Sequence, residues 1–357
     1  MRRELENSGQ SSLESDKVTF AEVADRYKEL KLNPPVFRNG IKVSGLRSYK
    51  TQRYILKPLK EFFGRKKIRS IKPSDLEDYK GKRLATPVIV NRKVKRKNPN
   101  KGRKKYIFET VEESRDRSIA SVNRELSLLR QIFGFALSED LILRNPFERT
   151  KKLISLAAEK QRDRVLSKQE EISLLAACES SNRIHIRPII ITALDTAMRK
   201  GEQLKLKWED VNFNESIITV LATNTKTEKE RLIGMTSRVK AELKELWNMS
   251  PKNREILVFG IENNFKRAWK SALKEAGLDN SDLRFHDLRH TAITRMVRAG
   301  VSIAEAMKVS GHTEMKTFQR YVNLTNESVS HVAELLEEFN RQTLNNEFGV
   351  SESSLVN

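Results

Sequence analysis

The stretch from Ser118 to Ser138 constrains the fold of this chain more than any other. Five apolar residues recur in it at intervals of three and four: Val122, Leu126, Leu129, Phe133 and Ala136. This spacing places them along one face of an α-helix. An amphipathic helix of this length must bury its apolar face against other elements, so we expect a core of packed helices.

Shorter helices are predicted before this one. Thr19 and Glu22 have the spacing of a capping box, in which each side chain bonds the backbone amide of the other. Apolar residues then continue at helical spacing over 20–30. Two further helices are predicted over 49–63 and from Pro73 to Tyr79, where proline suits a first helical position.

A strongly basic insertion, near 86–117, interrupts this helical region. From Asn91 to Lys105, nine of fifteen residues are basic and none is acidic. They are Arg92, Lys93, Lys95, Arg96, Lys97, Lys101, Arg103, Lys104 and Lys105. We expect 88–90 and 106–108 to pair as a short hairpin. The basic run is either a solvated loop that never orders or an arm that lies along a phosphate backbone and orders on DNA.

The second half mixes helices with a small sheet. Ser167 and Glu170 form a second capping box, 187–197 is apolar enough for a buried helix, and the chain is helical from Asn263 to about Leu344. Two strands, 216–221 and 230–235, are predicted around a polar turn. The fold class is therefore mainly α with a small β-sheet. The predicted parts are a polar tail (1–16), a mostly helical domain (17–150), a linker (151–166), a mixed α+β domain (167–346) and a second polar tail (347–357).

The charge of the chain indicates its class of partner. The formal net charge is +21 and the pI is near 9.9. Such an excess favours binding to a polyanion, with release of counterions from nucleic acid as the usual gain. Charge alone does not separate DNA from RNA or from an acidic membrane.

The remaining composition favours an intracellular protein. No apolar run approaches the roughly 18 residues of a membrane span, and 1–16 are polar, so we expect neither a membrane anchor nor a secretory signal. The single cysteine, Cys178, is expected to be a small buried apolar residue and fits a reducing cytosol. One cysteine and five scattered histidines suggest no metal cluster.

Six polar residues of the second half form the candidate site: Arg199, Lys226, His286, Arg289, His312 and Tyr321. Two guanidiniums, an ammonium, two imidazoles and a phenol are suited to attack on a phosphodiester without a metal. Charge grows on the equatorial oxygens of the five-coordinate phosphorus, and arginine forks can stabilise it. Glu202 is placed to hold or orient Arg199, and His286 and Arg289 share a helix face.

The chemistry assigns a role to each group. Tyr321 is the candidate nucleophile, and His286 or His312 is expected to accept its proton. Lys226, at a hairpin turn, is expected to protonate the leaving 5′-oxygen. Because a phosphotyrosine bond retains the energy of the broken linkage, rejoining requires no nucleotide cofactor, and none is predicted.

Each residue also has a structural interpretation. Tyr321 alone would be a partly buried core residue, and Lys226, among Lys229 and Arg231, one more surface charge. Arg199 could simply pair with Glu202. We expect His290 to be a structural neighbour of the site, and His185 and His331 to be surface or packing residues. The occurrence of all six groups in one order argues against coincidence.

In this order the residues resemble the tyrosine recombinase, or phage integrase, family. That family carries an arginine, a lysine on a hairpin, His-x-x-Arg, then Gly-His and a tyrosine nine residues later. The match runs from about Leu166 to Asn323. Ala197 stands where a glycine is common, and Asn323 where a histidine often follows the tyrosine.

The resemblance implies a helical (SAM-like) core-binding domain and a mixed α+β catalytic domain clamped around double-stranded DNA. It implies a site-specific recombinase, tetrameric on DNA, that works through a 3′-phosphotyrosyl intermediate and a Holliday junction. It also implies action in the cytoplasm at the nucleoid, with a DNA-bending accessory protein as a further partner. Integration or excision of a mobile element is favoured. Chromosome-dimer resolution, a type IB topoisomerase-like enzyme and an inactive DNA-binding relative are the alternatives.

The resemblance further implies a role for the C-terminal helix. Its apolar stripe is formed by Val329, Val332, Leu335, Leu336 and Phe339. In the family such a helix docks onto a neighbouring protomer. Packing against its own chain is the alternative.

Overall fold

The computed structural model describes residues 17–38, 41–97, 106–150, 153–159, 162–179, 185–225, 229–322, 333–334 and 336–342. The chain divides into two compact units between Gln161 and Arg162. This division lies inside the predicted linker (151–166), but the two ends of the linker pack into the hydrophobic cores of the two units. Leu153 is buried in the first unit and Leu166 in the second, because each apolar side chain packs into the nearer core.

In its described residues the first unit is built on four helices, all predicted from the sequence. They are α2 (Phe20–Lys31), α3 (Tyr49–Phe63), α4 (Pro73–Ala85) and α5 (Ile119–Ser138), with short 3-10 turns at η1 (Ile68–Ser70) and η2 (Pro146–Arg149). The predicted capping box starts α2: Thr19 N donates to Glu22 Oε2 at 2.7 Å, and Glu22 N donates to Thr19 Oγ1 at 3.4 Å. Local capping chemistry therefore determines where this helix begins.

A cluster of aromatic rings joins the four helices. The ring of Phe20 lies 5.5 Å from that of Phe63 and 6.3 Å from that of Phe133, and Phe63 lies 5.3 Å from Tyr79. The ring planes are tilted, which is a favourable geometry for aromatic pairs. Because each ring comes from a different helix, the cluster fixes the packing of the unit.

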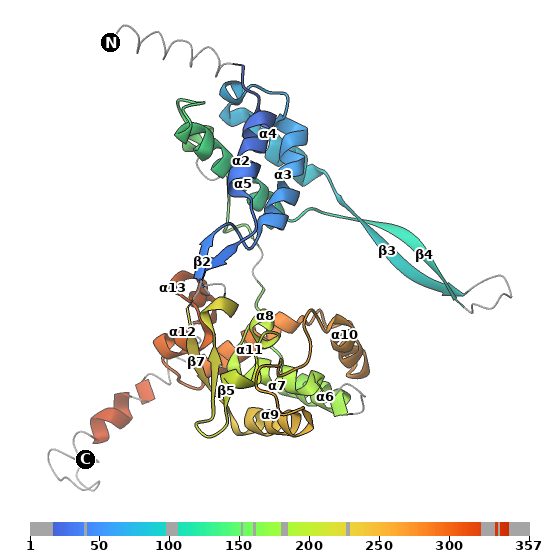
Figure 1. Ribbon diagram of the computed structural model, residues 1–357, viewed down its shortest axis with the longest axis vertical. Coiled ribbons are helices and arrows are strands. Elements are labelled where there is room, and N and C mark those ends of the chain that lie inside the picture. The colour runs from blue at the N-terminus through green and yellow to red at the C-terminus, as the bar shows by residue number, and fades with distance from the viewer. Residues whose placement is uncertain are drawn as a thin grey trace, which may run out of the picture. The chain divides into compact units, whose positions relative to one another are not determined.

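The described part of the first unit also contains two antiparallel pairs of strands. One pairs β1 (Val36–Arg38) with β2 (Ile41–Ser44), and the other pairs β3 (Val88–Lys97) with β4 (Tyr106–Arg115). The long β3–β4 hairpin projects from the helices of its unit (Figure 1).

The predicted short hairpin is wrong, since Val88 pairs with Arg115 and Phe108 pairs with Lys95. Strand pairing continues through the basic run, so 91–97 do not form a loop. Lys101, Arg103, Lys104 and Lys105 lie outside the described residues.

The second unit packs helices around a three-stranded sheet. The helices are α6 (Lys168–Glu179), α7 (Ile186–Thr196), α8 (Lys200–Gln203), α9 (Ser237–Met249), α10 (Lys266–Glu275), α11 (Phe285–Arg298), α12 (Ile303–Ser310) and α13 (Met315–Phe318). The antiparallel sheet has the order β5 (Val211–Asn212), β6 (Ile217–Val220), β7 (Arg231–Gly234), and the 3-10 turns are η3 (Trp208–Asp210), η4 (Ala222–Asn224) and η5 (Gln319–Tyr321). The mainly α fold class with a small sheet is confirmed. Neither α9 nor the short strands β1, β2 and β5 were predicted.

Helix α7 forms the centre of this unit. Its residues Ile189, Ile190 and Ile191 are buried on successive sides, as predicted for a helix inside a core. It packs against α11 and α9, while Ile218 and Val220 of β6 belong to the same core. Helices α7 and α11, which carry the site residues at their ends, therefore pack against each other in this core. In the described ranges, no helix is both long enough and apolar enough to cross a bilayer.

Candidate active site

Arg199 and Glu202 form a closed pair at the start of α8. Arg199 N donates to Glu202 Oε2 at 2.8 Å, and its Nη1 donates to Oε1 at 2.9 Å. Nη2 of Arg199 reaches the carbonyl oxygen of Gly311 at 3.1 Å. Glu202 thus orients the guanidinium, in the arrangement expected for this pair.

Arg289 lies almost wholly inside the protein, at 3% exposure. It comes from α11, and its Nη1 donates to the carbonyl oxygen of Ala197 at 2.5 Å. Among the described residues, its Nη2 has no hydrogen-bond partner. Burial, together with the charge of Arg199, lowers the pKa of Arg289 to about 9. A buried cation with an unsatisfied donor is suited to receive an anion.

Ala197 explains one departure from the resembling family. It ends α7 with φ 53°, in the left-handed region that glycine adopts without penalty. An alanine there costs about 1 kcal/mol in backbone strain. The strained turn aims the Ala197 carbonyl at Arg289, so this residue links α7 to α11.

Tyr321 contacts His290, and it contacts neither His286 nor His312 through its hydroxyl, although these two were predicted to accept its proton. The hydroxyl of Tyr321, in η5, lies 2.5 Å from Nδ1 of His290. No hydrogen bond to that hydroxyl from His286 or His312 is found in the part of the chain that the structure describes. His290, expected as a structural neighbour of the site, is thus in direct contact with the candidate nucleophile. The sequence signal was available: His290 is one helical turn after His286, on the same face of α11.

The other two predicted histidines lie close to this pair. The ring of His286 is 4.9 Å from that of His290, and the ring of His312 is 5.9 Å from that of Tyr321. Nδ1 of His312 is 2.8 Å from the hydroxyl oxygen of Ser310. The structure thus brings both imidazoles into the site without placing either on the phenol.

Burial and nearby arginines keep the imidazoles neutral. Burial and Arg320 lower the pKa of His290 to about 4, and burial and Arg289 lower that of His312 to about 4. Burial, then Arg289, also lowers the pKa of His286. For Tyr321, burial raises the pKa against the opposing charges of Arg320, Arg289 and Arg199. At neutral pH a protonated phenol therefore faces a neutral imidazole that can accept its proton.

Lys226 lies outside the described residues, but the ends of its turn are described. The hydroxyl of Thr225 donates to the carbonyl oxygen of Ala222 at 3.0 Å and accepts from Lys229 N at 3.2 Å. Thr225 is fully buried. The buried Thr225 thus joins the two described ends of the segment that carries Lys226, between β6 and β7.

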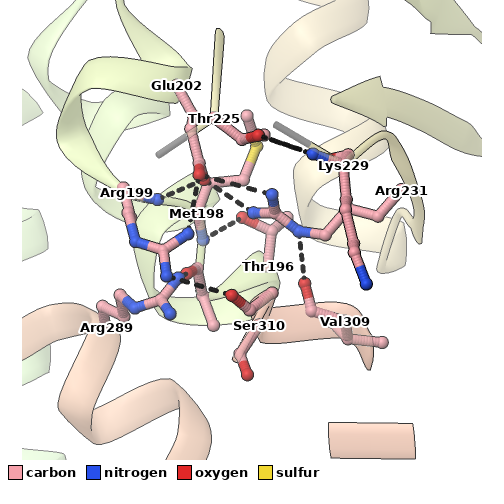
Figure 2. Close-up of polar contacts among 12 residues, drawn as sticks. Thr196, Met198, Arg199, Glu202, Thr225, Lys229, Arg231, Arg289, Val309 and Ser310 are labelled. Atoms are coloured by element: carbon pink, nitrogen blue, oxygen red, sulfur yellow. Dashed lines mark hydrogen bonds and ion pairs between the residues drawn. The ribbon is translucent and has the colours of Figure 1, made fainter. Parts of the chain in front are cut away.

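Arg231, a charged neighbour of Lys226 in the sequence, is not a surface charge. Its side chain is 5% exposed and pairs with Glu202, Nη2 to Oε2 at 2.6 Å (Figure 2). Only tertiary contacts reveal this, since Arg231 and Glu202 are 29 residues apart.

Five of the nine predicted DNA-binding residues lie on β3 of the first unit, and the other four lie outside the described residues. Arg92, Lys93 and Arg96 are exposed on β3. Lys95 and Lys97 occupy strand positions, but their side chains lie outside what the structure describes.

Comparison with known proteins identifies the second unit. Residues 164–328 match the model of the phage integrase family. The shufflon-specific DNA recombinase of Escherichia coli is 33% identical over 207 residues, which are 57% of this chain and 51% of that protein. This chain therefore spans about half the length of that relative.

Two solved structures share the fold. The Tn1549 transposon integrase in complex with circular intermediate DNA has a TM-score of 0.61 at 17% identity, over 88% of this chain and 99% of that one. A lambda integrase tetramer bound to a Holliday junction has a TM-score of 0.56 at 19% identity, over 84% of this chain and 79% of that one. At these identities the likeness concerns the fold alone. The resemblance seen in the sequence is confirmed: residues 164–328 of this chain match the phage integrase family, and a DNA recombinase is among the similar proteins.

Proposed function

We propose that this protein is a site-specific DNA recombinase that cleaves and rejoins strands through Tyr321. The observation that carries the proposal is the contact of the Tyr321 hydroxyl with His290 at 2.5 Å, beside an arginine whose buried Nη2 lacks a partner among the described residues. A nucleophile, a proton acceptor and an anion site are thereby combined. The matching relatives include recombinases and an integrase bound to DNA, which supports DNA as the substrate.

The geometry supports an ordered mechanism. The scissile phosphate binds to Arg289 and Arg199, whose forks stabilise the charge of the five-coordinate phosphorus. The Tyr321 oxygen forms a bond to phosphorus, its proton passes to Nδ1 of His290, and the bond to the 5′-oxygen breaks. Lys226 supplies the proton to that leaving oxygen. Attack by a new 5′-hydroxyl reverses these steps and needs neither a metal nor a nucleotide cofactor.

The β3–β4 hairpin is proposed as a further contact to the DNA backbone. Arg92, Lys93 and Arg96 are exposed on a strand with no acidic residue between Asn91 and Lys97. Such residues gain affinity by displacing counterions from phosphates. One charge is already paired, since Arg96 Nε lies 2.7 Å from Glu109 Oε2.

We further propose a tetramer on DNA that passes through a Holliday junction, as the lambda integrase tetramer binds one. Leu336 and Phe339 of the C-terminal helix are 57% and 66% exposed, and the other members of its apolar stripe lie outside the described residues. Truncation after Asn326 tests docking of this helix: we expect loss of the tetramer with cleavage retained. Unchanged assembly would exclude the docking.

The biological role is proposed as integration or excision of a mobile element, at the nucleoid, with a DNA-bending accessory protein as a further partner. Chromosome-dimer resolution is the alternative among recombinases. A type IB topoisomerase-like enzyme would relax plasmids of arbitrary sequence. An inactive relative would bind DNA without cleaving it.

Covalent trapping tests the central proposal. Wild type and Tyr321→Phe are incubated with nicked suicide substrates taken from the flanks of the encoding gene, in the presence of chelator. We expect a denaturation-resistant adduct with a free 5′-hydroxyl, formed by the wild type alone. An adduct that persists in Tyr321→Phe would exclude Tyr321 as the nucleophile. Binding to a cognate site selected from random DNA, without an adduct, would exclude catalysis.

A further inference from the structure

Arg231 joins three segments that are far apart in the sequence. It opens β7, the strand that follows the Lys226 turn. Its Nη2 donates to Glu202 Oε2 at 2.6 Å, and its Nε donates to the carbonyl oxygen of Val309 at 2.8 Å (Figure 2). The strand is thereby tied to α8 and to the end of α12.

The same guanidinium packs against the residue that precedes His312. Gly311 ends α12 with φ 70°, in the region that favours glycine. A Cβ at this position would lie only 3.2 Å from Cζ of Arg231, so the glycine also permits a close approach. Arg199 Nη2 donates to the Gly311 carbonyl oxygen. Two arginines therefore contact the residue that presents His312.

Arg231 also determines how charge is shared in the site. The Glu202 carboxylate accepts from both Arg199 and Arg231, and it is 2% exposed. Burial alone would raise the pKa of Glu202, but the hydrogen bonds from Arg231 and Arg199 hold it below its usual range. The carboxylate is thus ionised, and its charge acts strongly on both arginines because it is shielded from water.

The two arginines are not equivalent. The side chain of Arg231 is 5% exposed, whereas that of Arg199 is 25% exposed and can meet a ligand. If Arg231 were absent, Arg199 would be the one cation among the described residues that is hydrogen-bonded to Glu202. The negative charge of Glu202 would then cancel the positive charge of Arg199. With Arg231 present, the group of Arg199, Arg231, Arg289 and Glu202 holds three positive charges against one negative.

We infer that Arg231 is a positioning residue that offsets the charge of Glu202, so that the positive charge of Arg199 acts on a bound phosphodiester, and that holds the Gly311–His312 turn beside it. The ligand in this inference rests on the proposed function. Arg231 itself touches no reacting atom. It acts through Glu202 and through Gly311.

Three variants separate the role in charge from a role in folding. Arg231→Met removes the charge, Arg231→Lys keeps it without the fork, and Arg231→Met with Glu202→Gln removes both partners while the amide oxygen still accepts from Arg199. The rate of adduct formation is measured in single turnover, with duplex affinity and thermal unfolding in parallel. Arg238→Met is the matched control, because Arg238 pairs with Glu171 and Asp195 outside the catalytic group.

We expect Arg231→Met to form the adduct roughly 10 to 100 times more slowly, with duplex affinity within about threefold of wild type, because the loss falls on the transition state. The double variant should be faster than Arg231→Met, and Arg231→Lys should be intermediate. The control should stay within about threefold of wild type. If Arg231→Met does not fold, the comparison of Arg231→Lys and the double variant with wild type carries the test.

Two results would overturn the inference: a wild-type rate in Arg231→Met, or a double variant no faster than Arg231→Met. If Arg231→Met does not fold, the inference would be overturned by a double variant that forms the adduct at least tenfold more slowly than Arg231→Lys.

A phosphate-binding measurement separates failure of this inference from failure of the proposed function. We expect inorganic phosphate to raise the unfolding temperature of wild type more than that of Arg231→Met. If wild type forms no adduct, the proposed function fails, and equal phosphate shifts in the two proteins would then overturn the inference as well.

Discussion

Nη1 of Arg289 donates to the carbonyl oxygen of Ala197 at 2.5 Å, while its Nη2 is buried without a partner among the described residues. A guanidinium held by a strained turn on one side and unsatisfied on the other is a preformed anion site. Because the donor is fixed before the ligand arrives, little reorganisation is needed during the reaction. The unsatisfied guanidinium thus lowers the stability of the ligand-free protein, and it stabilises the negative charge of the transition state.

Arg289→Met tests this exchange. Removal of a desolvated, incompletely paired charge should raise the free energy of unfolding by about 1 kcal/mol, while adduct formation falls about 10² to 10³-fold. Thermal unfolding and single-turnover cleavage measure the two effects. Arg238→Met should instead lower stability, since Asp195 loses its paired cation while Glu171 keeps only Arg295. A destabilised Arg289→Met with normal cleavage would contradict the assignment.

His290→Asn should slow adduct formation by about 10²-fold, because the tyrosine loses the acceptor of its proton. His312→Asn should have a smaller effect, as His312 makes no hydrogen bond with Tyr321 in the described part of the chain. The rate of His290→Asn should rise with pH as the phenol itself begins to ionise. A pH-independent deficit, or a larger loss in His312→Asn, would favour another acceptor.

Stability should decrease in mild acid. The pKa values of His290 and His312 are about 4 in the folded protein, against about 6.5 in an unfolded chain. The unfolded chain therefore binds protons first as pH falls, so this contribution is complete above pH about 6.5 and is lost progressively toward pH about 4. Unfolding midpoints at pH 7 and pH 5 measure it. His312→Asn should show a shallower decrease, and a steeper one would contradict the sign.

Glu125 should be essential to the core of the first unit. Its carboxylate, 5% exposed, accepts from the Tyr79 hydroxyl at 2.8 Å and from Arg83 Nη2 at 2.6 Å. Glu125→Ala leaves both donors without this partner and should cost about 3 kcal/mol of unfolding free energy. Tyr79→Phe, which removes one hydrogen bond, should cost about 1 kcal/mol. Equal losses in a denaturant titration would mean that Glu125 contributes through the tyrosine alone.

Replacement of Arg92, Lys93 and Arg96 by glutamine should weaken duplex binding without altering adduct formation at saturating DNA. The slope of log affinity against log salt should become shallower by about 0.9 for each DNA phosphate that the variant no longer neutralises. Glu112→Gln with Glu113→Gln, on the facing strand, is the matched control and should leave affinity unchanged or increase it. An unchanged salt slope in the triple variant would show that the hairpin does not bind DNA.

Sequence reasoning was reliable where the determinants are local. The capping boxes at Thr19 and Ser167 and the periodicity of 118–138 depend on residues within a few positions of each other, and they predicted the helices that are observed. The identities and order of six residues were also sufficient to indicate the family: Arg199, Lys226, His286, Arg289, His312 and Tyr321.

Partners in space required the tertiary structure. The imidazole in contact with Tyr321 is 31 residues away, the carbonyl bound by Arg289 is 92 away, and the Gly311 oxygen bound by Arg199 is 112 away. Burial of Arg231 and the long register of β3 and β4 likewise depend on contacts that no local pattern contains. The sequence determined which chemical groups are present and which segments are helical, because short-range hydrogen bonds and periodicity control both. Packing alone decided which histidine meets the tyrosine and which arginine is left unsatisfied, because these depend on how α7, α11 and α12 pack together.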